Sequence, residues 1–174
     1  WNWMAMLLCT FLGFAQEKNS EPPKLVVGVI VDQMRFDFLE KYEANFGDGG
    51  FKRLMRDGYS FENTHYNYVP TVTAAGHASI YTGATPSVHG IIENTWYERD
   101  SKGLVSNVGD TTVRIVGSVV ENYSGYSPAR LETSTISDLL REQSDSRSKV
   151  ISVSLKDRGA ILPGGKKANA AYWQ

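Results

Sequence analysis

Two short apolar runs stand out in the hydrophobic pattern of the chain. Residues 25–31 (LVVGVIV) form one run, rich in β-branched side chains, and residues 149–154 (KVISVS) form the second. Short continuous runs of this kind, bounded by polar residues, are typical of strands that are buried on both faces of a parallel sheet. Residues 170–173 predict the start of a further strand. The pattern therefore predicts a mostly parallel central sheet.

The intervals between these runs predict helices and shorter β elements. Apolar residues recur there with helical spacing, or alternate with polar ones as in a half-buried strand. In chain order we expect a helix at 35–42, a helix at 51–56, a strand at 59–68, a helix from about residue 73 to residue 81, a hairpin at 96–106, a helix at 136–143 and a turn at 161–165. Helices that alternate with apolar strands indicate an α/β fold, with helices flanking the sheet.

The composition and net charge of the chain limit the kinds of molecule that it is expected to bind. The chain has 174 residues and 41% hydrophobic content, which is enough for one globular domain with a core. Its formal net charge is −1 and its pI about 6.3, so it carries no basic footprint for nucleic acid or for an anionic membrane. We therefore expect a small-molecule ligand in a pocket and no nucleic-acid partner.

The N-terminal residues have the pattern of an export signal. Residues 1–15 carry no charge, and their apolar run at 4–14 is shorter than the ~20 residues of a membrane-spanning helix. Small residues at positions 13 and 15 fit a signal-peptidase site. We expect residues 1–15 to be a signal peptide that lacks its basic start, residues 16–24 a polar linker, and residues 25–174 a folded domain. A buried N-terminal helix is the alternative. The signal peptide implies a periplasmic or secreted protein without a stable membrane anchor.

Thr73 is the first candidate for chemistry. It stands between a turn fixed by Pro70 and the small residues that open a predicted helix. A hydroxyl in the first turn of a helix lies beside unpaired backbone N–H groups, which favour a phosphate or a developing oxyanion. This is a suitable place for a nucleophile. The same pattern also fits an ordinary threonine N-cap, which needs no chemistry.

Asp32 ends the first apolar run. The carboxyl ends of the strands are where open α/β sheets bind their ligands, so this carboxylate is a candidate for ligand or metal binding. Alternatively, it caps the helix predicted at 35–42. The local pattern favours neither interpretation.

Three further polar residues are candidates for phosphate binding. Lys156 and Arg158 follow the second apolar run, where two cations would meet the nonbridging oxygens of a phosphate. They also fit a pair of surface charges around Asp157. Asn94 lies in a predicted loop, where its amide can donate two hydrogen bonds to a phosphoryl oxygen or cap a turn.

The three histidines have no metal-ligand spacing with one another or with a cysteine. Isolated residues of this kind are usually structural, and we expect that role for His65, His77 and His89.

Four ordered segments carry a resemblance to a known family. They are VVGVIVDQMRFD (26–37), GGFKRLMRDGYSFENTHYNYVP (49–70), PTVTAAGHASIYTG (70–83) followed by HGI and Asn94, and SKVISVSLKDRGAILPGG (148–165). Together they resemble the alkaline phosphatase superfamily. The resemblance is closest to the type I phosphodiesterase/nucleotide pyrophosphatase group and to the bacterial phosphate-irrepressible (PafA-type) alkaline phosphatases, and it covers residues 25–174.

This resemblance implies a role for each candidate. It implies that Thr73 is the nucleophile and a metal ligand, that Asp32 binds a catalytic Zn²⁺, and that Asn94, Lys156 and Arg158 bind the phosphoryl group. Two Zn²⁺ ions per site are implied, and most of their ligands would lie beyond residue 174. We therefore expect the chain to be the N-terminal part of a longer catalytic domain, truncated after the first few strands, which hydrolyses little by itself.

The function that these expectations predict is zinc-dependent hydrolysis of phosphate monoesters through a phosphothreonine. Two added cations favour a dianionic monoester over a monoanionic diester. A phosphodiesterase or nucleotide pyrophosphatase of the same superfamily is the first alternative. A noncatalytic binding protein that retains the fold is the second.

Overall fold

The structure is a computed structural model that describes residues 23–117 and 124–174. The predicted signal peptide and most of the predicted linker lie outside these residues. The helices are α1 (Phe38–Lys41), α2 (Gly50–Asp57), α3 (Thr73–Thr82), α4 (Pro86–His89), α5 (Ile136–Gln143) and α6 (Asp157–Gly164), with a 3₁₀ turn at Glu43–Asn45. The strands are β1 (Thr95–Glu98), β2 (Gly103–Ser106), β3 (Gly109–Asp110), β4 (Gly125–Tyr126), β5 (Ile151–Val153) and β6 (Ala170–Tyr172).

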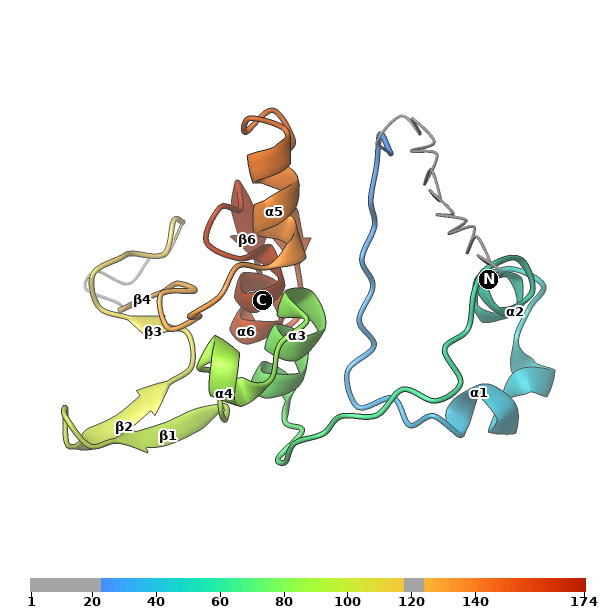
Figure 1. The fold of residues 1–174 in the computed structure, drawn as a ribbon, viewed down its shortest axis with the longest axis horizontal. Helices are drawn as coiled ribbons and strands as arrows, with labels where there is room; N and C mark the ends of the chain where they lie inside the picture. The colour runs from blue at the N-terminus through green and yellow to red at the C-terminus, as the bar shows by residue number, and fades with distance from the viewer. Residues whose placement is uncertain (1–22, 118–123) are drawn as a thin grey trace, which may run out of the picture.

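The packed body of the protein runs from α3 to β6 (Figure 1). Its buried apolar side chains come from α3, from the segments around β1 to β4 and from α6, and α3 packs directly against α6. The cluster consists of Ala74, Ala78, Ile91, Val108, Leu131, Ile161 and Leu162. None of the residues of α1 and α2 is buried, and Figure 1 shows these two helices apart from the body.

The strands form three pairs within the described residues. β1 and β2 make the antiparallel hairpin predicted at 96–106, and β3 pairs with β4. β5 and β6 are parallel, with α6 between them in the chain. A parallel pair needs such a crossover, because the chain must return to the same end of the sheet. The strand predicted at the C-terminal end is therefore confirmed as β6.

The first apolar run does not form the predicted buried strand. Residues 25–31 are extended but have no strand partner in the described part of the chain, and Leu25 and Val29 are 77% and 78% exposed. β5 is a strand, yet Ile151 and Val153 are also exposed. An apolar parallel strand is buried by neighbouring strands on both sides and by helices on both faces. The described part of the chain has too few strands and helices around residues 25–31 and β5 to bury them.

Three other predicted elements differ from the structure. Residues 59–68 form no strand, and the helix predicted at 35–42 is limited to α1, which begins at Phe38. Residues 161–164 belong to α6, where a turn was expected. The alternation of apolar residues and the presence of glycines are weak predictors of secondary structure in a short segment, because tertiary contacts decide its conformation. No helix among the described residues is long and apolar enough to cross a bilayer.

Candidate active site

Thr73 is the first residue of α3. Val72 occupies the N-cap position with an extended backbone, and the helix has no side-chain cap there. The hydroxyl of Thr73 instead donates a hydrogen bond to Oδ2 of Asp32, at 3.1 Å. The structure therefore rules out the N-cap interpretation of Thr73. The hydroxyl is held beside the positive end of a helix of 10 residues.

Asp32 connects two of the candidate residues. Its Oδ2 accepts the hydrogen bond from Thr73 and also lies 3.5 Å from Nζ of Lys156. It does not cap α1, whose N-cap residue is Asp37. One carboxylate oxygen thus brings a hydroxyl and an ammonium group together, although the three residues lie on segments far apart in the sequence.

Asn94 lies just before β1, in the loop that the sequence predicts. Its side-chain Oδ1 accepts a hydrogen bond from the backbone N–H of Ala74, at 3.1 Å. This bond satisfies one of the unpaired donors in the first turn of α3. It also fixes the orientation of the amide, because the oxygen must face Ala74 and the Nδ2 donors must point elsewhere. Asn94 therefore caps the helix, and its Nδ2 donors have no hydrogen-bond partner within 23–117 and 124–174.

Lys156 and Arg158 stand at the N-terminal end of α6, directly after β5. Lys156 is the N-cap residue, and Arg158 contacts Asp157, with Nη1 at 3.4 Å from Oδ1. The Nε of Arg158 is buried and has no hydrogen-bond partner among the described residues. Lys156 is therefore joined to Thr73 through Asp32, whereas no contact joins Arg158 to the other candidates.

A glycine allows α6 to lie close to its neighbours. A Cβ on Gly159 would be 2.3 Å from Oγ of Ser154 and 3.8 Å from Nε2 of His77. His77 belongs to α3, and its Nδ1 donates to the carbonyl oxygen of Thr73, at 2.7 Å. The end of α6 that carries Lys156 thus meets the turn of α3 that carries Thr73. The sequence pattern gave no indication of this contact, because a glycine within LKDRGA fits a loop equally well.

His89 is completely buried and has both ring nitrogens occupied. Nδ1 accepts from the N–H of Ile91, at 3.1 Å, and Nε2 lies 2.9 Å from Oγ of Ser79. Burial lowers the pKa of His89 below its ordinary value, so the ring is neutral. In this state Nε2–H donates to Ser79 and connects α3 to the chain that leads to Asn94.

The described residues offer an incomplete set of metal ligands. The Asp32 carboxylate and the Thr73 hydroxyl are two oxygen donors that face each other. A structural or catalytic Zn²⁺ needs about four ligands, usually including histidine. No group of three or more His, Cys, Asp or Glu residues within 23–117 and 124–174 is placed to hold a metal ion. The pair therefore fits one part of a zinc site.

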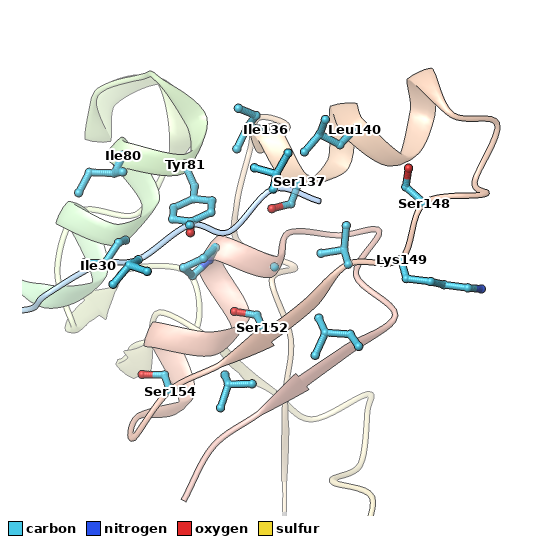
Figure 2. Close-up of a pocket in the computed structure, with 18 of the residues that line it drawn as sticks. Ile30, Ile80, Tyr81, Ile136, Ser137, Leu140, Ser148, Lys149, Ser152 and Ser154 are labelled. Carbon is cyan, nitrogen blue, oxygen red and sulfur yellow. The ribbon is translucent and has the colours of Figure 1, made fainter. Parts of the chain in front are cut away.

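One cavity is separate from these residues. It has a volume of about 590 Å³ and lies between residues 23–30, α3, α5 and β5. Figure 2 shows Ile30, Tyr81, Ser137 and Ser152 around it. None of the five predicted site residues lines this cavity. The predicted residues gather instead at the N-terminal ends of α3 and α6.

Comparison with known proteins places residues 26–174 in one family. Residues 26–174 match the family model of type I phosphodiesterase/nucleotide pyrophosphatase. The chain is 48% identical over 160 residues to alkaline phosphatase PafA of Elizabethkingia meningoseptica, and 54% identical over 151 residues to alkaline phosphatase PhoV of Synechococcus elongatus. These matches cover 91% and 87% of this chain, but 29% and 27% of the relatives.

The fold is also similar to that of a solved structure. The crystal structure of PafA matches with a TM-score of 0.85 and 48% identity, over 89% of this chain and 30% of that one. A variant of PafA with a substituted threonine, asparagine, lysine and arginine matches with the same TM-score of 0.85. The predicted α/β fold of alkaline-phosphatase type is thereby confirmed. The chain spans about 30% of the length of the PafA chain that it matches.

Proposed function

Because the chain belongs to the type I phosphodiesterase/nucleotide pyrophosphatase family, we propose that it forms the N-terminal part of an enzyme that hydrolyses phosphate monoesters. The observation that carries the proposal is the meeting of Thr73, Asp32 and Lys156 at one carboxylate oxygen. Phosphoryl transfer depends on a positioned nucleophile and on positive charge near the phosphate oxygens, and this arrangement offers a group for each. The similarity to PafA and PhoV, both named alkaline phosphatases, also supports it.

In the proposed reaction, Oγ of Thr73 attacks the phosphorus atom, its proton passes by way of Asp32 to solvent, and the bond to the leaving oxygen breaks. Asp32 holds the hydroxyl hydrogen, so that the oxygen lone pairs of Thr73 face the substrate. Water then hydrolyses the phosphothreonine and releases inorganic phosphate, while the leaving alkoxide takes a proton from solvent. The enzyme is thereby returned to its starting state.

We propose that Asp32 and Thr73 bind Zn²⁺ together with ligands from beyond residue 174. Bound zinc would lower the pKa of the threonine hydroxyl and neutralise the leaving oxygen. Asp32 and Thr73 would each contribute an oxygen ligand. The family's requirement for further His and Asp ligands is the reason that residues 1–174 are not expected to act alone.

Asn94, Lys156 and Arg158 are proposed to bind the phosphoryl oxygens. The amide of Asn94 meets the first turn of α3 through Oδ1, which leaves its Nδ2 donors without a partner among the described residues. The ammonium group of Lys156 is near Thr73 through Asp32. The buried Nε of Arg158, without a partner among the described residues, is a donor for which a phosphate oxygen would be a suitable acceptor. The four residues substituted in the PafA variant are of these same types. They follow one another at the same intervals as Thr73, Asn94, Lys156 and Arg158, which supports their assignment.

Two other functions remain as alternatives. Hydrolysis of phosphodiesters or nucleotide pyrophosphates is named by the family itself. The ammonium group of Lys156, which meets Thr73 at Asp32, instead favours a dianionic monoester, and Arg158 would add a second cation for it. A noncatalytic binding protein would keep the fold and lack the remaining metal ligands. We also propose export to the periplasm or the medium, on the pattern of residues 1–15.

Substitution of the nucleophile tests the proposal. In the full-length protein, Thr73→Ala should abolish turnover of p-nitrophenyl phosphate, and no phosphorylated enzyme should be trapped by acid quench, because the attacking oxygen is lost. Thr71→Ala is the matched control, since Thr71 is exposed and lies two residues away. Normal turnover by the Thr73→Ala protein would contradict the proposed mechanism.

A further inference from the structure

Asn107 makes two hydrogen bonds to a single atom of Asn94. It follows β2, where its backbone N–H donates to the Asn94 carbonyl oxygen at 3.2 Å and its side-chain Nδ2 donates to the same oxygen at 2.6 Å. The backbone bond continues the β1–β2 ladder by one step, because Thr95 is paired with Ser106. The side-chain bond is additional to anything that the hairpin requires.

The burial of Asn107 indicates that this second bond is important. Asn107 is 1% exposed, and its Oδ1 is buried without a hydrogen-bond partner in the described part of the chain. An unpaired buried amide oxygen destabilises a protein, so an apolar residue would be favoured here if only packing mattered. The amide cannot be reversed, because its oxygen would then face the Asn94 carbonyl oxygen at 2.6 Å.

Asn107 is itself held firmly. The next residue, Val108, is buried in the same apolar cluster as Ala74, and its carbonyl oxygen accepts from the N–H of Ser127, at 2.8 Å. Asn94 therefore lies between two fixed points. Its carbonyl oxygen is bound by Asn107, and its side-chain Oδ1 is bound by the N–H of Ala74.

We propose that Asn107 is a positioning residue that orients the Asn94 side chain toward the phosphoryl group. This inference rests on the proposed role of Asn94 in the reaction. With the carbonyl oxygen and Oδ1 of Asn94 both held, the orientation of its amide group is fixed, and with it the direction of the Nδ2 donors. Asn107 makes no contact with substrate in this arrangement and acts only through Asn94.

A double-mutant cycle in the full-length protein tests whether Asn107 acts through Asn94. Asn107→Asp keeps the shape of the side chain but replaces the donor with an oxygen that repels the Asn94 carbonyl. We expect kcat/KM for p-nitrophenyl phosphate to fall by about five- to tenfold, as for the loss of one hydrogen bond. In an Asn94→Ala background, the same substitution should change kcat/KM by less than about twofold, because the group that it orients is absent.

A second measurement does not depend on turnover. Hydrogen exchange of the segment that contains Ala74 should become faster in Asn107→Asp, because Asn94 no longer holds the Ala74 N–H. It should not increase further when Asn107→Asp is added to Asn94→Ala. If Asn107→Asp does not fold, Asn107→Ser, which retains a hydroxyl donor, replaces it in the same cycle with a smaller expected loss.

Asn45→Asp is the matched control, since Asn45 is exposed in the 3₁₀ turn Glu43–Asn45, which buries no residue, and it should change neither quantity. Equal losses in the two backgrounds, or unchanged exchange at Ala74, would overturn the inference. A different result, retained turnover by the Thr73→Ala protein, would contradict the proposed function itself.

Discussion

At the scale of single residues, the arrangement is governed by the charge of Asp32. A carboxylate that is one-third exposed holds both the Thr73 hydroxyl and the Lys156 ammonium group. The pair of charges is weak as a source of stability, because water screens it. In the proposed mechanism, its value lies in placing a cation beside Thr73, the proposed nucleophile, before the substrate arrives.

Lys156 should therefore affect specificity more than folding. We expect Lys156→Ala in the full-length protein to reduce kcat/KM for a phosphate monoester by about 10²–10³-fold. The loss for the corresponding methyl diester should be much smaller, because the monoanion gains less from this cation. Steady-state kinetics on the two substrates measure the difference. Lys166→Ala, at an exposed position after α6, is the control. Equal losses on both substrates would argue against Lys156 as the determinant of monoester preference.

At the scale of elements, the site depends on how closely α6 approaches β5 and α3. Thr73 is the first residue of α3 and Lys156 is the N-cap residue of α6, so a shift of either helix would separate them. Gly159 is the point of contact, where a Cβ would collide with Ser154. Gly76 in α3 is the opposite case, because a Cβ there would have nothing within 4 Å.

The two glycines give a matched pair of substitutions. Gly159→Ala should lower the free energy of unfolding by about 1–3 kcal/mol, because the methyl group forces α6 away from Ser154. Gly76→Ala should be neutral or raise it by up to about 1 kcal/mol, because alanine favours the helix. Urea denaturation of the full-length protein measures both. A Gly159→Ala protein as stable as the parent would show that α6 can move without cost.

At the scale of the whole molecule, a large apolar surface is left uncovered. Residues 25–31, β5 and residues 59–69 all include exposed large hydrophobic side chains, and Val69 is 90% exposed. α1 and α2 lie apart from the body and bury no residue (Figure 1). Exposed large apolar side chains that follow one another in a segment, as at residues 25–31, mark surfaces that are normally in contact with other protein. This chain spans about 30% of the PafA chain that it matches, so that chain contains a large further part.

Residues 1–174 produced alone should accordingly be unstable. We expect strong binding of the dye ANS and a broad unfolding transition at low urea concentration, because residues 25–31 lack neighbouring strands. The full-length protein is the control and should show neither property. A sharp, cooperative transition without ANS binding would show that the segment is self-sufficient.

Local features of the fold could be predicted from the sequence. The helix at 136–143 and the hairpin at 96–106 are present where the pattern places them, and Thr73 begins a helix as expected. Each depends on residues close together in the chain, such as the capping box of Thr135 and Asp138 at the start of α5. The family could also be identified from four sequence segments. The export signal and the roles of the five site residues stay predictions.

The sequence by itself determined which residue types were available for the chemistry and which local elements carry them. Only the tertiary structure decided that Asp32 meets Thr73, 41 residues away, that Asn94 caps α3, and that the buried Asn107 holds Asn94. It also decided that residues 25–31 are exposed, although their composition predicts burial. The physical reason is the same in each case. Hydrogen bonding and burial depend on which distant segments pack together. Hydrophobic periodicity indicates only which face of each segment is able to pack, and not which segment it packs against.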